Sequence, residues 1–318
     1  MRLLIDHATV VVSGTKVASE IGVSRSEVWR LIQQLRALGV DIGGHPATGY
    51  SLKSMPDLLL PDLLAPLLQR TLFGRNIHHF YKIGSTNTAA IEAASSGAPE
   101  GSVFVAEQQT AGRGRGENQW YSARSLGIYC SVVLRPKLPP SDVLVLTLAA
   151  GLALQAAVQD VDPAVQVDLK WPNDALIGGK KVCGILTEMN SELTQVRHIV
   201  LGTGINVNQT EFPADLREIA TSLKIVSGTE YSRLQVCAAF LRALDREYKQ
   251  LLDGGASAHD SILRRFTERS PSASGARVRV EDRVAFEGVT EGLDSRGFLK
   301  VRVDDKVRTV LSGMVTLK

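Results

Sequence analysis

The spacing of the apolar residues changes twice along the chain, and each change limits the fold of the segment that follows. The first fifty residues carry apolar side chains at helical spacing, a long central segment alternates strand-like with helical runs, and the last fifty residues alternate apolar and polar side chains. Segments rich in proline, serine or glycine mark both changes, at residues 54–66 and 270–275. We therefore expect three units, over residues 1–60, 61–269 and 270–318.

The first unit is predicted to be a winged helix-turn-helix. Ser24 and Glu27 have the spacing of a capping box, and Gly39 is placed to end the helix that begins there. A shorter helix ends at Gly22, and the residues after Gly39 have two β-prone ends around a glycine- and proline-rich tip, as in a hairpin wing. If the second helix enters a DNA groove, the candidate DNA-binding residues are Ser24, Arg25, Ser26, Arg30 and Gln33.

Charge limits how this unit would bind DNA. The whole chain carries a net charge of only +3, which is too small for unspecific phosphate binding by its entire surface. Any contact with nucleic acid must therefore be local, and the modest positive charge of the first unit favours a dimer. The alternative is that these polar side chains form only the solvated face of a helix.

Composition indicates an ordinary globular protein. Hydrophobic residues make up 44% and charged residues 22% of the 318 residues, which is enough for a sizeable core. Cys130, Cys183 and Cys237 lie far apart without CxxC spacing, which argues against a disulfide framework or a zinc site. We therefore expect a reducing, cytoplasmic compartment. No run reaches the ~18 apolar residues of a membrane span, so no membrane partner is expected.

The central unit is predicted to be an α/β domain with a mixed sheet, and the last unit a small β-barrel of four or five strands, so that the chain as a whole is α+β. Strand-like runs cover residues 78–83, 101–108, 127–135, 165–171, 181–189 and 198–207. Helical patterns cover residues 87–96, 142–158 and 233–252.

Two polar segments could bind an anion. In residues 111–120, AGRGRGENQW, the glycines leave backbone N–H groups free to surround a ligand beside Arg113 and Arg115. In residues 170–186, Lys170, Asp174 and Lys181 fall near the ends of adjacent strands, where the lysines suit a triphosphate and the carboxylate suits Mg2+. The first segment is not a P-loop, because it has no GxxxxGK(S/T) pattern. The alternatives are an exposed linker and an ordinary hairpin with solvated charges.

Two further segments offer neutral hydrogen-bonding groups. GSTNT, residues 84–88, precedes a helix, and its side chains would either cap that helix or hold a neutral polar head group such as a urea. GTGINV, residues 202–207, places Asn206 at the end of an apolar strand, where a buried amide needs partners.

Taken in order, GSTN, EQQTAGRGRG followed by a Trp, KWPND, KVCGIL and GTGINVN resemble the motifs of biotin protein ligases. The preceding helix-turn-helix resembles that of the bifunctional bacterial form, which also represses biotin operons, and the C-terminal segment is similar to that family's SH3-like domain. The resemblance covers essentially the whole chain. It implies that biotin and ATP, with Mg2+, form biotinoyl-AMP, which then biotinylates one lysine of a carboxylase's biotin carrier domain. Operator DNA and a ligand-promoted homodimer are the other implied partners.

The resemblance also implies roles for single residues. Lys181 and Arg115 would be catalytic, with Lys181 bridging the biotin carboxylate and the α-phosphate. Biotin contacts are expected at Ser85, Thr86, Asn87, Gln109, Gly112, Arg113, Gly114, Arg115, Lys181 and Gly184. Nucleotide contacts are expected at Arg115, Lys170, Asn173, Asp174, Asn206 and Asn208, with Asp174 also serving Mg2+.

The chain departs from the family pattern at one place. Family members often carry further Arg and Lys residues before the Trp of the loop, whereas this chain has Gly116, Glu117, Asn118 and Gln119 there. Trp120 itself is expected either to pack over the site or to belong to the core.

Two other functions remain open at this point. A repressor that only senses biotin without catalysis is disfavoured because Lys181, Asp174 and Arg115 are all retained. A lipoate ligase with a similar fold is disfavoured by the KWPND and GRGRG segments and by the terminal β-domain.

Overall fold

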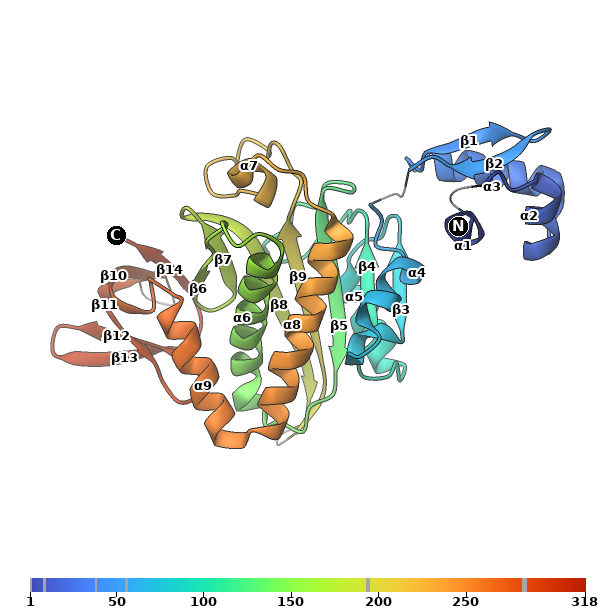
Figure 1. Ribbon diagram of the computed structural model, residues 1–318. Helices are drawn as coiled ribbons and strands as arrows, with labels where there is room; N and C mark the ends of the chain where they lie inside the picture. The colour runs from blue at the N-terminus through green and yellow to red at the C-terminus, as the bar shows by residue number, and fades with distance from the viewer. Residues whose placement is uncertain (1, 8–9, 38, 55–56, 193–194, 282–284) are drawn as a thin grey trace. The chain divides into compact units, whose positions relative to one another are not determined.

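A computed structural model describes the chain except for residues 1, 8–9, 38, 55–56, 193–194 and 282–284 (Figure 1). It divides into two compact units, residues 1–58 and 59–318, which are described separately. The second unit contains both the central segment and the C-terminal strands.

The first unit is a helix-turn-helix followed by a hairpin, as expected. Ser13 accepts a hydrogen bond from the backbone of Lys16 at the start of one helix, and Ser24 accepts one from the backbone of Glu27 at the start of the next. Gly22 ends the shorter helix with a φ of 69°. The elements are α1 (Arg2–Asp6), α2 (Gly14–Ile21), α3 (Arg25–Ala37), β1 (Ile42–His45) and β2 (Gly49–Leu52).

A seven-stranded sheet with the order β3-β4-β5-β9-β8-β7-β6 forms the centre of the second unit. β3 and β4 are parallel and all other neighbours are antiparallel, so the sheet is mixed, as predicted. The strands are β3 (Ile77–Phe80), β4 (Val103–Ala106), β5 (Gly127–Leu134), β6 (Asp168–Lys170), β7 (Asp174–Ile177), β8 (Lys180–Ser191) and β9 (Val196–Asn206).

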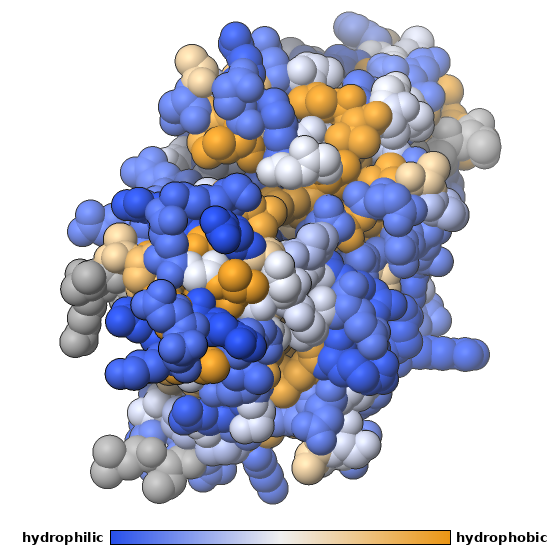
Figure 2. Space-filling model, turned by 90° about the vertical axis from the view of Figure 1, so that its left-hand side faces the viewer, coloured by the Kyte–Doolittle hydropathy of each residue, from blue (hydrophilic) through white to orange (hydrophobic). Residues whose placement is uncertain are grey.

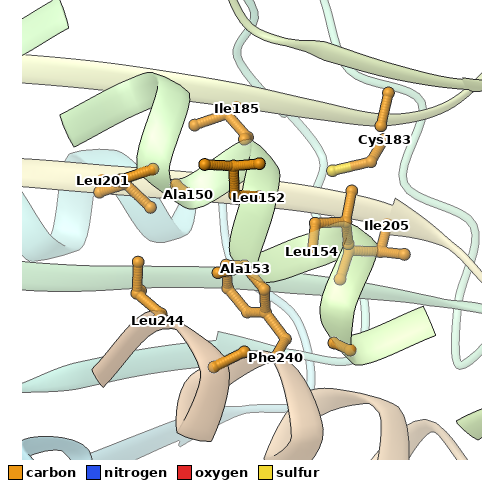
Figure 3. Close-up of a cluster of buried hydrophobic side chains, with 14 of the residues drawn as sticks. Ala150, Leu152, Ala153, Leu154, Cys183, Ile185, Leu201, Ile205, Phe240 and Leu244 are labelled. Atoms are coloured by element: carbon orange, nitrogen blue, oxygen red, sulfur yellow. The ribbon is translucent and has the colours of Figure 1, made fainter. Parts of the chain in front are cut away.

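Helices cover the sheet unequally on its two faces (Figure 1). α6 (Val143–Val161), α8 (Arg233–Asp253) and α9 (Gly255–Glu268) share one core with residues such as Val132 of β5 and Leu201 of β9 (Figure 3). α5 (Thr86–Ser95) instead packs against Val133 and Val200. Because neighbouring residues of a strand point to opposite faces, α5 covers the face opposite α6.

The helix α6 is long and apolar enough to cross a membrane by length and composition. The sequence criterion of ~18 apolar residues therefore missed a segment that passes a hydropathy test. In the structure, 78% of this apolar window is buried inside the protein, between β8 and α8. The helix is therefore apolar because it lies in the core of the protein.

A buried ionic cluster joins several elements of the second unit. Arg233 at the start of α8 lies 2.8 Å from Glu107, and the side chains are 0% and 1% exposed. The Glu107 carboxylate also lies 3.0 Å from the His79 ring and accepts the backbone N–H of Leu59 at 2.9 Å. Burial alone would raise the pKa of Glu107, but the hydrogen bond from His79 and the charge of Arg233 outweigh it and lower that pKa.

The C-terminal segment is an antiparallel sheet with the order β13-β12-β11-β10-β14. It is fixed to the central sheet because the indole N–H of Trp171 donates to the carbonyl of Gly297 at 2.9 Å. The predicted linker at 270–275 is also packed, since Ser270 and Ala273 are buried. The strands are β10 (Ser274–Glu281), β11 (Phe286–Leu293), β12 (Leu299–Val303), β13 (Lys306–Val310) and β14 (Met314–Leu317).

Several elements were not among the sequence predictions. They are α1, β7, α9, the short helices α4 (Pro61–Leu64) and α7 (Leu223–Ser227), and the 3-10 turns at Ala65–Leu68, Leu72–Gly74 and Pro140–Asp142.

Candidate functional site

A cavity of about 850 Å³ in the second unit brings the five sequence motifs together. Gly184, Gly202 and Gly204 line it, and their neighbours Cys183, Leu201 and Ile205 belong to the core that contains α6. The cavity therefore lies on the sheet face opposite α6. Figure 2 views the molecule from the side of the C-terminal strands, where apolar residues appear as orange patches among hydrophilic ones. Two exposed apolar residues, Ile219 and Met314, are also part of the cavity lining.

The first part of the cavity wall is cationic. Lys181 on β8 forms an ion pair with Asp174 on β7, with 2.6 Å between Nζ and Oδ1. The two strands form a tight hairpin because Gly178 and Gly179 adopt positive φ angles of 56° and 78°. The hairpin therefore places the ammonium group and the carboxylate side by side in the lining.

Arg115 adds a second cation to this wall. Its Nη1 donates to the side-chain oxygen of Asn173 at 3.3 Å, and the Asn173 amide nitrogen donates to the carbonyl of Ile185 at 2.7 Å. Burial lowers the pKa of Arg115, while the nearby charge of Asp174 raises it. A guanidinium remains charged through such a shift, so this wall presents fixed positive charge.

The second part of the wall is neutral and rich in hydrogen bonds. The side-chain oxygen of Gln109 accepts from the backbone N–H of Thr86 at 2.8 Å and from its hydroxyl at 3.1 Å. The Ser131 hydroxyl lies 2.7 Å from the side-chain oxygen of Asn87. These side chains are buried or partly buried and uncharged, which suits a neutral polar ligand group.

The loop of residues 111–122 is a small hairpin beside these two walls. The backbone N–H of Gly114 donates to Asn118 at 2.8 Å, and that of Trp120 donates to Gly112 at 2.9 Å. Glu117 is exposed at the turn and is not a lining residue. The substituted stretch 116–119 thus contributes Gly116, Asn118 and Gln119 to the cavity lining.

Trp120 packs over the two central strands, which was one of the two roles expected for it. A Cβ at Gly204 would lie 2.3 Å from Cε2 of the indole, and one at Gly184 would lie 2.9 Å from its Cζ3. The Lys181 ammonium is 5.5 Å from the centroid of the ring. Glycine at both positions is therefore required for this ring to lie against the sheet.

Most of the predicted ligand residues lie in the cavity lining. Gly112 and Asn208 do not: Gly112 is buried against the backbone of Trp120, and Asn208 makes two hydrogen bonds to the backbone of Tyr231, at 2.7 and 3.0 Å. The lining members are Ser85, Thr86, Asn87, Gln109, Arg113, Gly114, Arg115, Lys170, Asn173, Asp174, Lys181, Gly184 and Asn206. The Asn206 amide already donates to the carbonyl of Thr221 at 3.0 Å.

Sequence reasoning did not identify four parts of the site, one of which is the segment 212–220 with Phe212, Leu216, Glu218, Ile219 and Ala220 in the lining. Ser131 lies inside the strand β5, where a single serine in an apolar run gives no signal. Glu188 lies near the end of β8, where a single carboxylate in the sequence is typical of an exposed strand end. Residues 312–316 enter the lining from the C-terminal sheet, and only the tertiary fold brings them there.

The helix α3 and Ser24, which directly precedes it, carry the predicted DNA-binding residues of the first unit. Arg25 donates to the backbone carbonyl of Pro46 in the hairpin at 2.9 Å, and Ser24 and Ser26 share a hydrogen bond of 2.9 Å. Arg30 binds Glu27 on the same helix, with the shorter contact at 2.5 Å, and this hydrogen bond lowers the pKa of Glu27. Gln33 is half-buried. Because Arg30 already pairs with Glu27, its guanidinium would have to be shared between that carboxylate and a DNA phosphate.

Sequence families match both units. Residues 79–206 match the biotin/lipoate A/B protein ligase family, and residues 1–51 match a helix-turn-helix domain family. A "Bifunctional ligase/repressor BirA" of Bacillus spizizenii is 35% identical over 96% of this chain and 94% of its own length. A biotin--[acetyl-CoA-carboxylase] ligase of Mycobacterium tuberculosis is 33% identical over 81% of this chain and 97% of its own.

Solved structures show the same similarity. A biotin protein ligase from Aquifex aeolicus in complex with biotin and ATP has a TM-score of 0.66 and 26% identity, and it covers 77% of this chain and 99% of its own. A Leishmania major biotin protein ligase in complex with biotinyl-5-AMP has a TM-score of 0.53 and 25% identity over 75% of this chain and 99% of its own.

Proposed function

The chain belongs to the biotin protein ligase family, in its bifunctional ligase/repressor form, and from this we propose how its site works. The protein is a biotin--[biotin carboxyl-carrier protein] ligase that also acts as a repressor. It activates biotin with ATP to give biotinoyl-AMP and transfers the biotinoyl group to a lysine of a carrier domain.

The observation that carries the proposal is the division of one cavity into a neutral and a cationic wall. Lys181 and Leu186 both line the cavity on β8, and five residues of extended strand cover about 16 Å. A ligand with a neutral ring system at one end and a carboxylate at the other can contact both walls at once. Biotin has this form, with a ureido group near Thr86 and Asn87 and its carboxylate directed toward Lys181.

In the first step, the biotin carboxylate attacks the α-phosphate of ATP, and pyrophosphate leaves. Lys181 and Arg115 neutralise charge on the carboxylate and the phosphate, so two anions can approach each other. No protein nucleophile is needed, because the reaction depends on positioning and on charge. The ion pair with Asp174 holds the Lys181 ammonium in the cavity wall.

Mg2+ enters the proposal as a partner of ATP. The described residues contain no group of three His, Cys, Asp or Glu side chains that could hold a metal ion. Mg2+ commonly binds through one carboxylate together with substrate phosphates, and Asp174 is a lining carboxylate that fits this role. Lys170 and Asn173 lie in the same lining and would serve the nucleotide.

In the second step, the amine of a carrier lysine attacks the biotinoyl carbonyl, and AMP leaves. The exposed apolar side chains of Ile219 and Met314 lie at the cavity and would face the incoming carrier domain. We therefore propose that the acceptor protein binds between the segment around Ile219 and the C-terminal sheet.

The repressor activity is assigned to the first unit. We propose that the protein acts in the cytoplasm as a ligand-promoted homodimer that binds an operator. The net charge of the first unit is small, so two helix-turn-helix units on adjacent half-sites would supply the affinity that one lacks.

One assay separates the possible activities. The purified chain is incubated with ATP, Mg2+, a biotin carrier domain and either biotin or lipoate, and the mass of the carrier is measured. A gain of one biotinoyl group with biotin alone is expected. Labelling with lipoate alone would indicate a lipoate ligase, and tight biotin binding without labelling would indicate a sensor.

A further inference from the structure

Glu188 lies behind the cavity wall and holds two residues that line it. Its carboxylate accepts two hydrogen bonds from the Arg113 guanidinium, at 2.8 and 3.0 Å, and one from the Asn87 amide at 2.8 Å. Arg113 and Asn87 are both lining residues, whereas Glu188 is not. The carboxylate therefore connects the loop of residues 111–122 to the start of α5 without touching the cavity.

The same hydrogen bonds continue until they return to the loop. From Asn87 the path runs through the Ser131 hydroxyl to that of Thr86, at 2.7 and 2.9 Å. Thr86 donates to Gln109, whose amide nitrogen donates to Ser122 at 2.9 Å. The loop is thus held at Arg113 and again at Ser122 by one continuous set of contacts, which we call the closure ring: Arg113, Glu188, Asn87, Ser131, Thr86, Gln109 and Ser122.

The carboxylate gives the closure ring a direction. Because an ionised carboxylate only accepts hydrogen bonds, the Asn87 amide must turn its nitrogen toward Glu188 and its oxygen toward Ser131. The Ser131 proton is then used on Asn87, and the Thr86 hydroxyl proton is shared between the oxygens of Ser131 and Gln109. A ligand head group consequently meets donors and acceptors of defined position.

The site is shaped to allow this arrangement. A Cβ at Gly202 would lie 1.9 Å from the side-chain oxygen of Asn87, so only glycine leaves room for the amide. Asn87 is 4% exposed, whereas the Arg113 and Glu188 side chains are 44% and 27% exposed. An exposed ion pair by itself contributes little. The third hydrogen bond, to a buried amide in the head-group wall, distinguishes this carboxylate from a surface pair.

We propose that Glu188 is a positioning residue of the biotin site, which sets the Asn87 amide and closes the loop over the ligand through Arg113. This inference rests on the proposed ligase function and adds a residue to it. Glu188 acts through its neighbours and makes no contact with the reacting atoms. Its loss should weaken biotin binding and leave the chemical step unchanged.

The kinetic test compares Glu188→Gln with Glu192→Gln. Glu192 follows on the same hairpin and pairs with Arg197 at 2.6 Å, but both side chains are more than 60% exposed. In a biotin-dependent pyrophosphate exchange assay, Glu188→Gln should raise the KM for biotin about 10-fold and keep kcat within about twofold, since one charge-assisted acceptor is lost. Glu192→Gln should match the parent. A reduced kcat with an unchanged KM would overturn the proposal.

A double-mutant cycle tests whether the two ends of the ion pair act together. Arg113→Gln removes the other partner of the ion pair. Because the Arg113 side chain is the more exposed of the two, this variant can replace Glu188→Gln if Glu188→Gln folds poorly. Each single change should raise the KM, and the double variant should be no worse than the poorer single one. Strictly multiplicative effects would show that the two residues act independently and would refute the closure ring.

A readout that needs no ligase activity keeps the two proposals separate. Trypsin cleaves after Arg113 and Arg115, so the rate of loop cleavage in the protein without ligand reports how firmly the loop is held. Glu188→Gln should be cut several-fold faster than the parent and than Glu192→Gln. Faster cutting in a protein without ligase activity would refute the proposed function and support the closure ring. Equal cutting with equal KM would refute the role of Glu188.

Discussion

At the scale of single residues, the ion pair between Lys181 and Asp174 holds an ammonium group in the wall where the carboxylate and the phosphate are to react. The neighbouring Lys180 is different, because its ammonium donates to the backbone carbonyl of Arg217 at 3.1 Å and it does not line the cavity. The chain therefore offers two adjacent lysines of which only one is placed for chemistry.

We expect Lys181→Ala to lower kcat for biotinoyl-AMP formation by ~100-fold or more, which corresponds to about 3 kcal/mol of transition-state stabilisation. Lys180→Ala is the matched control and should stay within about twofold of the parent. Pyrophosphate exchange measures both, and circular dichroism checks the fold. Near-normal adenylation by Lys181→Ala would contradict the assignment.

The buried carboxylate of Glu107 predicts how stability depends on pH. The pKa of Glu107 is lowered in the folded state, so its ionised form stabilises the fold. This contribution to the free energy of unfolding is fully present above the unfolded pKa of about 4.3 and is lost as the pH falls through the pKa of the folded protein. Glu107→Gln removes the charge that pairs with the buried Arg233 guanidinium and should cost about 3–5 kcal/mol at pH 7. The difference from the parent should shrink as the pH falls below about 4. Urea unfolding at pH 7, 5 and 3.5 measures it, and a constant difference would contradict the prediction.

At the scale of elements, the strands and helices with strong periodicity were predictable, and those defined by tertiary contacts were not. The capped start of α3 and the apolar runs of β5, α6 and β9 are local signals. The strand β7 follows directly on a Trp-Pro-Asn turn and is only four residues long, and α9 begins with two small residues and no side-chain cap. Both elements are stabilised by neighbours that a local pattern does not show.

The candidate site likewise contains residues that local sequence motifs identify and residues that only tertiary contacts reveal. Lys181, Arg115 and Asn87 belong to motifs that sequence order identifies. Ser131 and Glu188 become recognisable only when strand alternation places them on the same face as Gly202. The C-terminal part of the lining depends on how the last sheet is fixed by Trp171, which no local pattern encodes.

Alanine substitutions at two glycines of these elements should have opposite effects, one weakening biotin binding and the other raising stability. Gly204→Ala would place a methyl group 2.3 Å from the Trp120 ring and should displace the loop, raising the KM for biotin about 10-fold, or about 1.4 kcal/mol. Gly151→Ala in α6 meets only ordinary contacts at 3.6 Å, and it should raise the free energy of unfolding by roughly 0.5–1 kcal/mol with an unchanged KM. Kinetics and urea unfolding check both variants. An unchanged KM for biotin in Gly204→Ala would show that the position of Trp120 is not needed for binding.

At the scale of the whole molecule, catalysis and DNA binding belong to separate compact units of one chain. Footprinting on DNA upstream of biotin genes should show an inverted repeat with half-sites separated by whole helical turns, about 10.5 base pairs each. Protection should strengthen with biotin and ATP. In Lys181→Ala, biotin and ATP should have no such effect, whereas preformed biotinoyl-AMP should restore it. Protection that is independent of ligand would refute the regulatory part of the proposal.

The burial of α6 also has a consequence for the making of the protein on the ribosome. The residues that cover this helix, in β8, β9 and α8, are synthesised after it, and the last of them follows α6 by about ninety positions. At 5–20 residues per second, an apolar helix of nineteen residues waits on the order of 5–20 seconds for its cover. During that interval the nascent chain is exposed to aggregation, so its yield in cells should depend on chaperones that bind apolar segments as they emerge.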